Sequence, residues 1–311
     1  MNKHEKKRLW QGFWQIADPK IWIASTIPMA VGATLAYTRT GQFSWKWFLL
    51  GAMAIYLIEI GKNAINEYVD YRSGVDRFVA DDKRTPFSGG KKTIIDGKLT
   101  LKENLIIGIL TISAGCLIGV LAVLLREFNI FWIGLAGVFF ALFYSLPPLK
   151  FSYRGLGETV VGITFGPLIT SGTYLLQAHI IDLPVLLISL PLGFLIANVL
   201  WINQYPDFEA DLQGNKRNSL VRLGKEKGVI VYAMLFIAAY LSIIIFAFFS
   251  NNYFMFLPLL SIPLARRAVV VCRQYNDDIP RLIEANVKTV LIYQVTGITI
   301  IIALFIGRFF G

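Results

Sequence analysis

The sequence predicts an all-α integral membrane protein, with about nine transmembrane helices in a bundle around a central lipid-accessible cavity. Two observations support this fold class. The chain of 311 residues is 55% hydrophobic and has a mean hydropathy of +0.58, above the balance typical of soluble domains. Apolar runs of roughly 20 residues also recur along the chain, and a helix of that length crosses a bilayer core of about 30 Å.

Nine spans follow from these runs. We place them at about 21–38, 47–70, 103–125, 129–147, 158–177, 183–205, 228–249, 252–272 and 288–307. The connection between the third and fourth spans is a tight turn near Arg126. The whole chain, 1–311, is expected to form a single membrane domain, in which loops 71–102 and 212–227 cap an active site.

The basic residues predict the orientation of the chain. Of 30 Lys and Arg residues, 25 fall on one side, in the N-terminal segment, 71–102, 150–154, 216–227 and 266–288. An excess of Lys and Arg marks the cytoplasmic side of a membrane protein. We therefore expect a multi-pass protein of the cell membrane whose N-terminus and active site are cytoplasmic. This bias, together with a need to attract anionic lipid headgroups, accounts for the net charge of +10. We therefore expect no nucleic-acid partner.

The cysteines and histidines exclude several kinds of centre. Cys116 and Cys272 both fall in apolar spans, so the sequence suggests neither a disulfide framework nor a cysteine metal site. His4 and His179 are isolated, which argues against a haem or zinc centre.

Two acidic segments end the second and sixth spans. The first is 66–76, which reads NEYVDYRSGVD, and the second is 203–211, which reads NQYPDFEAD. Residues four apart on a helix share a face, so the second segment is expected to point Asn203, Asp207 and Asp211 in one direction. Because helices four apart in a bundle run in the same direction, both segments are expected to meet on the cytoplasmic face.

The first acidic segment is not a plain helical stripe. Asn66 and Asp70 are four apart, but Asp76 follows Asp70 by six residues. Its carboxylate is therefore expected to return from the loop beyond Gly74.

Clusters of oxygen ligands next to basic loops indicate a particular ligand. Oxygen-only clusters suit Mg²⁺, which bridges carboxylates and phosphates, and carboxylates this close to lipid are functional candidates by default. We expect Mg²⁺ to link Asp70, Asp76, Asp207 and Asp211 to a diphosphate, with Lys and Arg neutralising the remaining charge. A diphosphate head above an apolar cavity describes a prenyl diphosphate. The alternative is that these acids merely balance a basic loop surface.

The reaction follows from such a site. Metal and basic groups stabilise a departing diphosphate, so the allylic C–O bond ionises. Aromatic ring faces can stabilise the allylic cation, which an electron-rich acceptor then attacks.

Several further segments accompany the acidic clusters in chain order. They are Asp18-Pro19-Lys20, Pro28, Gly32, 144–149 (YSLPPL), 154–158 (RGLGE), 165–168 (FGPL), Lys216-Arg217 and 221–224 (VRLG). Together they resemble the UbiA superfamily of intramembrane prenyltransferases over essentially the full chain. Within it, the sequence is similar to the 1,4-dihydroxy-2-naphthoate polyprenyltransferase group of menaquinone synthesis.

This resemblance implies a set of site residues. It implies Mg²⁺ bound through Asn66, Asp70, Asp76, Asp207 and Asp211, with Asp70, Asp207 and Asp211 essential for catalysis. It implies diphosphate contacts from Arg72, Lys91, Lys150 and Arg217. It also implies a small aromatic acceptor, expected to be 1,4-dihydroxy-2-naphthoate, which would lose carbon dioxide to give a demethylmenaquinone.

The chain departs from the family pattern at three places. Glu67 stands where an Asp is usual, and Asp18 stands where an Arg is common, which removes a diphosphate contact. Tyr144 and Lys150 are six residues apart, whereas many relatives place a Tyr and a Lys four apart.

Two questions stay open at the level of sequence. Glu59 and Lys62 could form a structural i,i+3 pair, or they could line the cavity, where Lys62 would orient an acidic group of the acceptor. The function could instead be that of a superfamily member with another aromatic acceptor, a terpene-cyclising enzyme, or a secondary transporter of an anionic solute.

Overall fold

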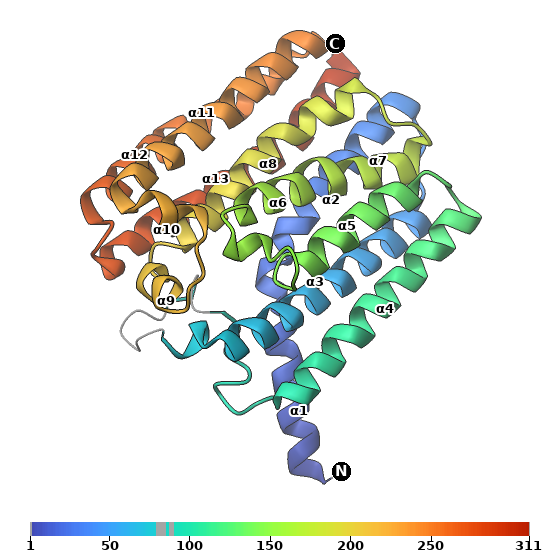
Figure 1. Ribbon diagram of the computed structural model, residues 1–311. Coiled ribbons are helices and arrows are strands. Elements are labelled where there is room, and N and C mark those ends of the chain that lie inside the picture. The colour runs from blue at the N-terminus through green and yellow to red at the C-terminus, as the bar shows by residue number, and fades with distance from the viewer. Residues whose placement is uncertain (1, 79–84, 87–89, 311) are drawn as a thin grey trace.

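The computed structural model describes residues 2–78, 85–86 and 90–310, and all regular secondary structure among them is helical (Figure 1). The longer helices are α1 (Lys3–Ala17), α2 (Ile23–Thr40), α3 (Trp45–Ser73), α4 (Leu101–Leu125), α5 (Ile130–Phe143), α6 (Gly157–Ile163), α7 (Ile169–Ala178), α8 (Leu183–Asn203), α11 (Lys225–Ser250), α12 (Ile262–Tyr275) and α13 (Ile279–Phe310). Short turns of helix connect them, namely η1 (Pro19–Trp22), η2 (Val75–Arg77), η4 (Phe151–Tyr153), η5 (Thr164–Leu168), α9 (Phe208–Gln213), α10 (Ser219–Leu223) and η6 (Tyr253–Ser261).

The all-helical membrane fold is confirmed, with one adjustment to the predicted count of spans. Among the described residues, 8 helical segments are long and apolar enough to cross a membrane. The predicted fourth span, 129–147, is shorter, because α5 has 14 residues and is only about 21 Å long. It begins after the tight turn that follows Leu125 and ends before Pro147, so its length is limited at both ends.

The last predicted span, 288–307, begins too late. Helix α13 starts at Ile279. Its first turns carry the charged residues Arg281, Glu284 and Lys288, and Glu284 pairs with Lys288 at 3.6 Å. Hydropathy alone does not distinguish such a polar helical turn from a loop.

The predicted fifth span is one helical rod with a local defect. Helix α6 continues through η5, whose hydrogen bonds follow the wider π pattern, into α7. Pro167 lies in η5 and lacks a backbone N–H, which explains the irregular turn. A Cβ on Gly166 would lie 2.7 Å from Cα of Gly193 in α8, so these two glycines allow the rods to approach closely.

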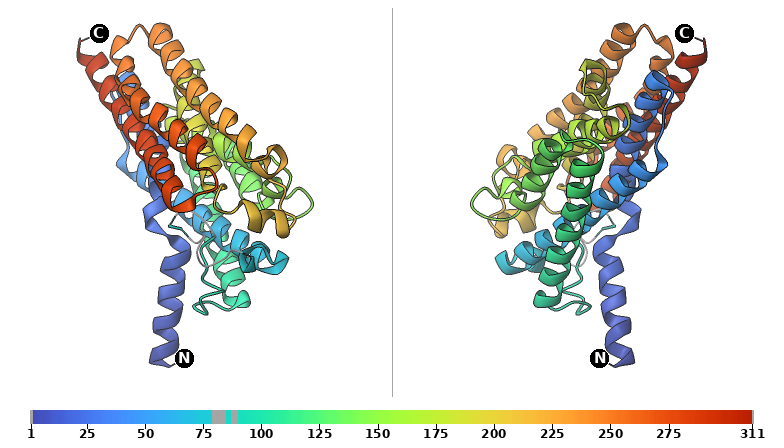
Figure 2. Two further views of the ribbon diagram at one scale, coloured as in Figure 1. Left: turned by 90° about the vertical axis from the view of Figure 1, so that its left-hand side faces the viewer. Right: turned by 90° about the vertical axis from the view of Figure 1, so that its right-hand side faces the viewer.

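Close packing also joins α3 to α4, which lie side by side along much of their length (Figures 1 and 2). A Cβ on Gly61 would lie 2.8 Å from the backbone oxygen of Gly108. On the other side of the bundle, α11 packs on α8, and α13 packs on α2 and α8. Helix α1 projects away from the bundle (Figure 2).

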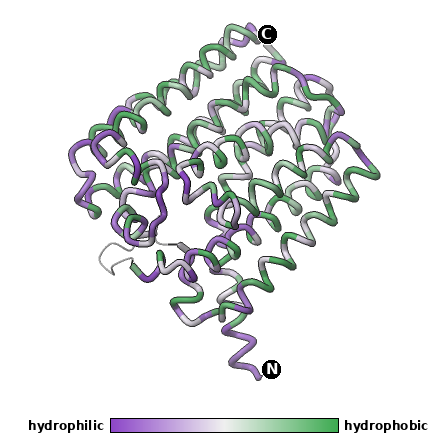
Figure 3. Tube along the Cα trace, viewed as in Figure 1, coloured by the Kyte–Doolittle hydropathy of each residue, from purple (hydrophilic) through white to green (hydrophobic). Residues whose placement is uncertain are grey.

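The outer surface of the bundle is apolar, and the polar residues gather at one end. Helix α11 exposes a stripe of Ile230, Met234, Ile237, Leu241 and Ile245, a spacing that gives one face of a helix. Figure 3 shows hydrophobic residues along the helices and hydrophilic residues around η2, α9 and α10. This pattern is the one expected for a multi-pass membrane protein with its polar site at one end.

Candidate active site

Helix α3 ends where the first acidic segment turns back. Gly74 has φ 87° and terminates the helix, a conformation that glycine adopts at little cost. The next residues form η2, and Asp76 within it is buried, with 4% of its surface exposed. The predicted return of Asp76 from beyond Gly74 is therefore confirmed.

The second acidic segment is not one helix, contrary to the prediction from its four-residue spacing. Helix α8 ends at Asn203, residues 204–207 form a turn, and α9 begins at Phe208. Pro206 lacks the N–H that a continuing helix would need. Asn203 accepts a hydrogen bond from Nδ2 of Asn286 at 2.8 Å, and it lines the same pocket as Asp207 and Asp211.

Lys216 joins the two acidic segments. Its Nζ donates to Oδ2 of Asp70 at 3.0 Å and lies 3.8 Å from Oδ1 of Asp211. The loop that carries it lies against the first segment, because a Cβ on Gly214 would be 2.3 Å from Val75. Two acids from distant parts of the chain, Asp70 and Asp211, thus share one cationic group.

Neutral hydrogen-bond donors hold the carboxylates in place. Tyr153 donates its hydroxyl to Oδ1 of Asp70 at 2.6 Å, and Nδ2 of Asn66 donates to Oδ2 at 3.1 Å. Asn218 donates to Oδ2 of Asp211 at 2.7 Å. Its own Oδ1 caps α10 by accepting from the backbone of Val221, so the side chain of Asn218 has a fixed position.

The burial of Asp76 and Asp211 makes these two acids hard to ionise without a compensating cation. Burial, followed by the negative charge of Asp70, raises the pKa of Asp76 to about 8. Burial raises the pKa of Asp211 to about 7, against the opposing effect of Lys216. Burial lowers the pKa of Lys216, but the charges of Asp211 and Asp70 outweigh it, and the net shift is strongly upward. The pocket therefore favours additional positive charge.

The oxygen atoms of this pocket suit a hard cation that a bound ligand also coordinates. Within the part of the chain that the structure describes, no three carboxylate, imidazole or thiol groups are placed to enclose a metal by themselves. The oxygens of Asp70 and Asp211 instead converge on one ammonium group, and Asp207 and Asp211 line the same 150 Å³ pocket as Lys216. Oxygen donors from few carboxylates, completed by water and phosphate oxygens, are the usual surroundings of Mg²⁺.

The four predicted diphosphate contacts occupy different positions. Lys150 lies at the edge of this cluster, with its Nζ 5.1 Å from the ring of Tyr153. Arg72 is exposed and donates to the hydroxyl of Tyr68 at 3.1 Å. Arg217 is exposed, one residue beyond Lys216. The structure thus places Lys150 beside Tyr153, whose hydroxyl binds Asp70, and leaves Arg72 and Arg217 exposed.

Lys91 is held by the residue that departs from the family pattern. Its Nζ donates to Oδ2 of Asp18 at 2.6 Å. Glu67, a second departure, accepts from Oγ1 of Thr93 at 2.7 Å and from the backbone N–H of Ile94 at 2.9 Å. Both unusual acids therefore fasten the segment that follows Gly90, Asp18 to the end of α1 and Glu67 to α3.

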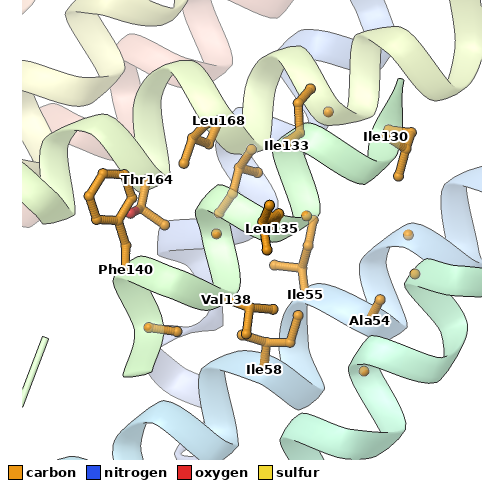
Figure 4. Close-up of a pocket in the computed structure, with 18 of the residues that line it drawn as sticks. Ala54, Ile55, Ile58, Ile130, Ile133, Leu135, Val138, Phe140, Thr164 and Leu168 are labelled. Atoms are coloured by element: carbon orange, nitrogen blue, oxygen red, sulfur yellow. The ribbon is translucent and has the colours of Figure 1, made fainter. Parts of the chain in front are cut away.

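An apolar cavity of 370 Å³ lies behind the acidic pocket, between α3, α4, α5, the α6–η5–α7 rod and α2 (Figure 4). Ile55, Ile58, Val138, Phe140 and Leu168 are among the side chains drawn around it in Figure 4. Along α3 it reaches from Lys62 to Gly51, about 16 Å at the rise of an α-helix. Tyr144 lines both this cavity and the acidic pocket, so the two spaces adjoin.

Glu59 and Lys62 line the cavity and do not form the i,i+3 ion pair that was one of the two alternatives. Glu59 accepts from Oγ of Ser25 at 2.6 Å through Oε2. Nζ of Lys62 lies 5.3 Å from the ring centroid of Tyr144. Ser25 belongs to α2, so the spacing within α3 gave no indication of this partner.

Sequence reasoning missed Lys216, Tyr153 and Asn218 as parts of the acidic pocket. The basic pair 216–217 belongs to the family pattern, and the resemblance implies Arg217 as the diphosphate contact. Asn215 has φ 56° and the backbone N–H of Lys216 bonds to the oxygen of Asp211 at 2.7 Å. This turn directs Lys216, and not Arg217, toward the acids. Only the conformation of the loop decides between the two residues.

Comparison with known proteins identifies the relatives of this chain. The profile of the UbiA prenyltransferase family matches residues 25–292. The 1,4-dihydroxy-2-naphthoate octaprenyltransferase of Haemophilus influenzae is 29% identical over 297 residues, covering 93% of this chain and 94% of the relative. The enzyme of the same name from Escherichia coli is 29% identical over 308 residues, covering 94% and 98%.

Solved structures share the fold at lower identity. A UbiA homolog from Aeropyrum pernix K1, in its apo form, superposes with a TM-score of 0.69 at 18% identity and covers 91% of this chain and 98% of its own. A UbiA homolog from Archaeoglobus fulgidus bound to GPP and Mg²⁺ gives 0.60 at 16% identity, covering 93% and 99%.

Proposed function

Because the chain belongs to the UbiA prenyltransferase family, we propose that it transfers a polyprenyl group from a prenyl diphosphate to 1,4-dihydroxy-2-naphthoate, with Mg²⁺ as its cofactor. The observation that supports this most strongly is the junction at Tyr144 between an acidic, lysine-bearing pocket and a long apolar cavity. A ligand with a polyanionic head and a hydrocarbon tail matches both spaces. The naphthoate acceptor is supported by the two bacterial relatives of that name.

The acidic pocket would bind the diphosphate and the metal. Asp70, Asp76, Asp207 and Asp211, with Asn66 beside them, would hold Mg²⁺, which would supply positive charge against the diphosphate oxygens. Lys216 and Lys150 would neutralise the remaining charge, and the exposed Arg72 and Arg217 would attract the anion from solution. Tyr153 and Asn218 fix the orientation of Asp70 and Asp211 through the hydrogen bonds described above.

The apolar cavity would hold the tail and keep water away from the reacting carbon. As the allylic C–O bond breaks, diphosphate leaves with the bonding electrons, and the ring of Tyr144 faces the space where the cation forms. The ring carbon of the acceptor that bears the carboxylate forms the new C–C bond. The carboxylate then departs as carbon dioxide, and its bonding electrons restore the aromatic ring, which gives the quinol form of a demethylmenaquinone.

The charge distribution supports a location in the cell membrane with the active site and the N-terminus on the cytoplasmic side. Lys216, Lys150 and the acids lie at the polar end of the bundle (Figure 3), the end that the positive-inside rule assigns to the cytoplasm.

The stoichiometry of products tests this function. Purified protein in detergent receives a prenyl diphosphate, Mg²⁺ and dihydroxynaphthoate, and released diphosphate and carbon dioxide are measured together. We expect equal amounts of both and loss of both on chelation of the metal. Diphosphate release without carbon dioxide would refute the naphthoate acceptor, and absence of diphosphate release would refute the transfer itself.

Metal binding should depend on pH. The raised pKa values of Asp76, about 8, and Asp211, about 7, mean that the folded protein binds protons more tightly than the unfolded chain. Without metal, stability should therefore fall as pH rises through these values. Mg²⁺ competes with those protons, so its stabilising effect should be larger at about pH 9 than at about pH 6. Thermal unfolding with and without Mg²⁺ measures this, and an effect independent of pH would contradict it.

The glycines of the apolar cavity should set the accepted chain length. Gly119, Gly134 and Gly137 line the cavity, and a Cβ on any of them would meet no atom within 4 Å. Gly137→Leu should fill this space and shift the kcat/KM ratio toward shorter prenyl diphosphates by about tenfold or more, whereas Gly137→Ala should shift it less. The ratio for geranyl against geranylgeranyl diphosphate checks this, and an unchanged ratio would show that the tail lies elsewhere.

A further inference from the structure

Lys62 places an ammonium group in the apolar cavity, below the acidic pocket. It precedes Asp70 by eight residues on α3, which puts it two helical turns, or about 12 Å, deeper along the axis. Glu59 and Lys62 are the two charged side chains among the residues that line the cavity. A charge in such surroundings is costly unless a partner offsets it.

Within the described part of the chain, no carboxylate contacts this ammonium group directly. No ion pair of Lys62 lies within 4.0 Å, although the charge of Glu59 on the same helix attracts it, and the ring centroid of Tyr144 lies 5.3 Å from Nζ of Lys62. The neighbouring Glu59 is engaged by Ser25. An ammonium group has three N–H donors, and here they face a cavity that a ligand must enter.

We propose that Lys62 is a positioning residue that binds the carboxylate of the aromatic acceptor, an inference that rests on the proposed prenyl transfer. The diphosphate of the donor lies at the level of Asp70, so its allylic carbon lies deeper, toward Lys62. The acceptor ring has to reach that carbon from the same level. A carboxylate on the ring then meets Lys62, while the ring itself stays beside Tyr144.

The charges around Lys62 restrict where an anionic group can lie. Glu59 is one turn deeper along α3 and offers no positive charge to a second carboxylate in the inner part of the cavity. Lys62 at the mouth attracts it. This arrangement favours an acceptor that carries an anionic group over a neutral quinol. Only an anionic group forms a charged hydrogen bond with the ammonium of Lys62, and that bond offsets the cost of burying the two charges.

Two acceptors test the role of Lys62. They are 1,4-dihydroxy-2-naphthoate and 1,4-dihydroxynaphthalene, which lacks the carboxylate, each with the same prenyl diphosphate. Lys62→Met should raise the KM for the naphthoate on the order of tenfold to a hundredfold, the equivalent of one charged hydrogen bond, and leave the KM for the diol nearly unchanged. Lys62→Arg should retain most of the preference for the naphthoate.

Lys46→Met is the matched control. Lys46 lies at the opposite end of the same helix and is exposed, so the substitution removes the same group without touching the cavity. It should behave as the parent protein with both acceptors.

A separate readout distinguishes this role from the others. Mg²⁺-dependent binding of the prenyl diphosphate, measured without acceptor, should be the same in Lys62→Met and the parent. Weaker donor binding would assign Lys62 to the diphosphate and overturn the proposal, and an equal loss with both acceptors would show a structural role and also overturn it. If the parent binds the donor but prenylates neither acceptor, the proposed function fails, and the role of Lys62 fails with it.

Discussion

Replacing Asp70 or Asp207 by Asn is expected to lower the rate of prenyl transfer by a factor of about 10² to 10³. One residue comes from each acidic segment, and each substitution removes a negative charge while keeping the shape of the side chain. Asp70 is 3% exposed and accepts hydrogen bonds from Tyr153, Asn66 and Lys216. Its loss should weaken the hold on Mg²⁺ and thus on the departing diphosphate.

The measurement is diphosphate release at saturating donor and acceptor, over a range of Mg²⁺ concentrations. Glu209→Gln is the matched control. Glu209 lies between Asp207 and Asp211 in the chain, but its side chain is exposed, and its Oε1 lies 3.8 Å from Nζ of Lys225. It should retain nearly full activity. Full activity in both Asp70→Asn and Asp207→Asn would disprove a shared metal site.

Lys216→Met should produce the second large effect, on binding of the donor. The substitution removes the cation that joins Asp70 to Asp211, and a charged hydrogen bond of this kind contributes about 1.5–3 kcal/mol. We expect kcat/KM for the prenyl diphosphate to fall on the order of tenfold to a hundredfold. Without metal the buried acids also lose their counter-charge, so stabilisation by Mg²⁺ in thermal unfolding should be larger than in the parent.

Lys225→Met controls for the loss of a lysine from the same polar end. The side chains of Lys225 and Lys216 are equally exposed, at 16%, but Lys225 pairs with Asp277 and Glu209 outside the pocket. It should change neither donor binding nor the effect of Mg²⁺. If both lysine variants lose donor binding to the same extent, a general electrostatic attraction would account for the result and Lys216 would have no special role.

The sequence predicts those features that depend on local chemistry. The apolar length of each span identifies most helices, and Gly74 predicts that α3 stops and that Asp76 returns from beyond it. The distribution of Lys and Arg predicts which helix ends carry the site. The number of helices between the two acidic segments gives the same answer independently, because it places both segments on one side.

Features that depend on a distant partner or on loop conformation could not be predicted. The four-residue spacing suggested one helix through the second acidic segment, although Pro206 is itself a local signal that a helix ends there. The turn at Asn215 selects Lys216 over Arg217. Glu59 bonds to Ser25, which lies 34 residues away. For Lys216 the deciding feature is the conformation of the loop, and for Glu59 it is a tertiary contact, so spacing along the chain carries no information about either.

The central claim is that the acidic pocket and the apolar cavity together transfer a prenyl group to an aromatic carboxylate. Mass spectrometry of the products tests it most directly, with purified protein, Mg²⁺, geranylgeranyl diphosphate and a panel of acceptors that includes dihydroxynaphthoate. We predict a prenylated naphthoquinol that requires both Mg²⁺ and the naphthoate. A hydrocarbon formed without acceptor, or a prenylated product from every acceptor except the naphthoate, would contradict it.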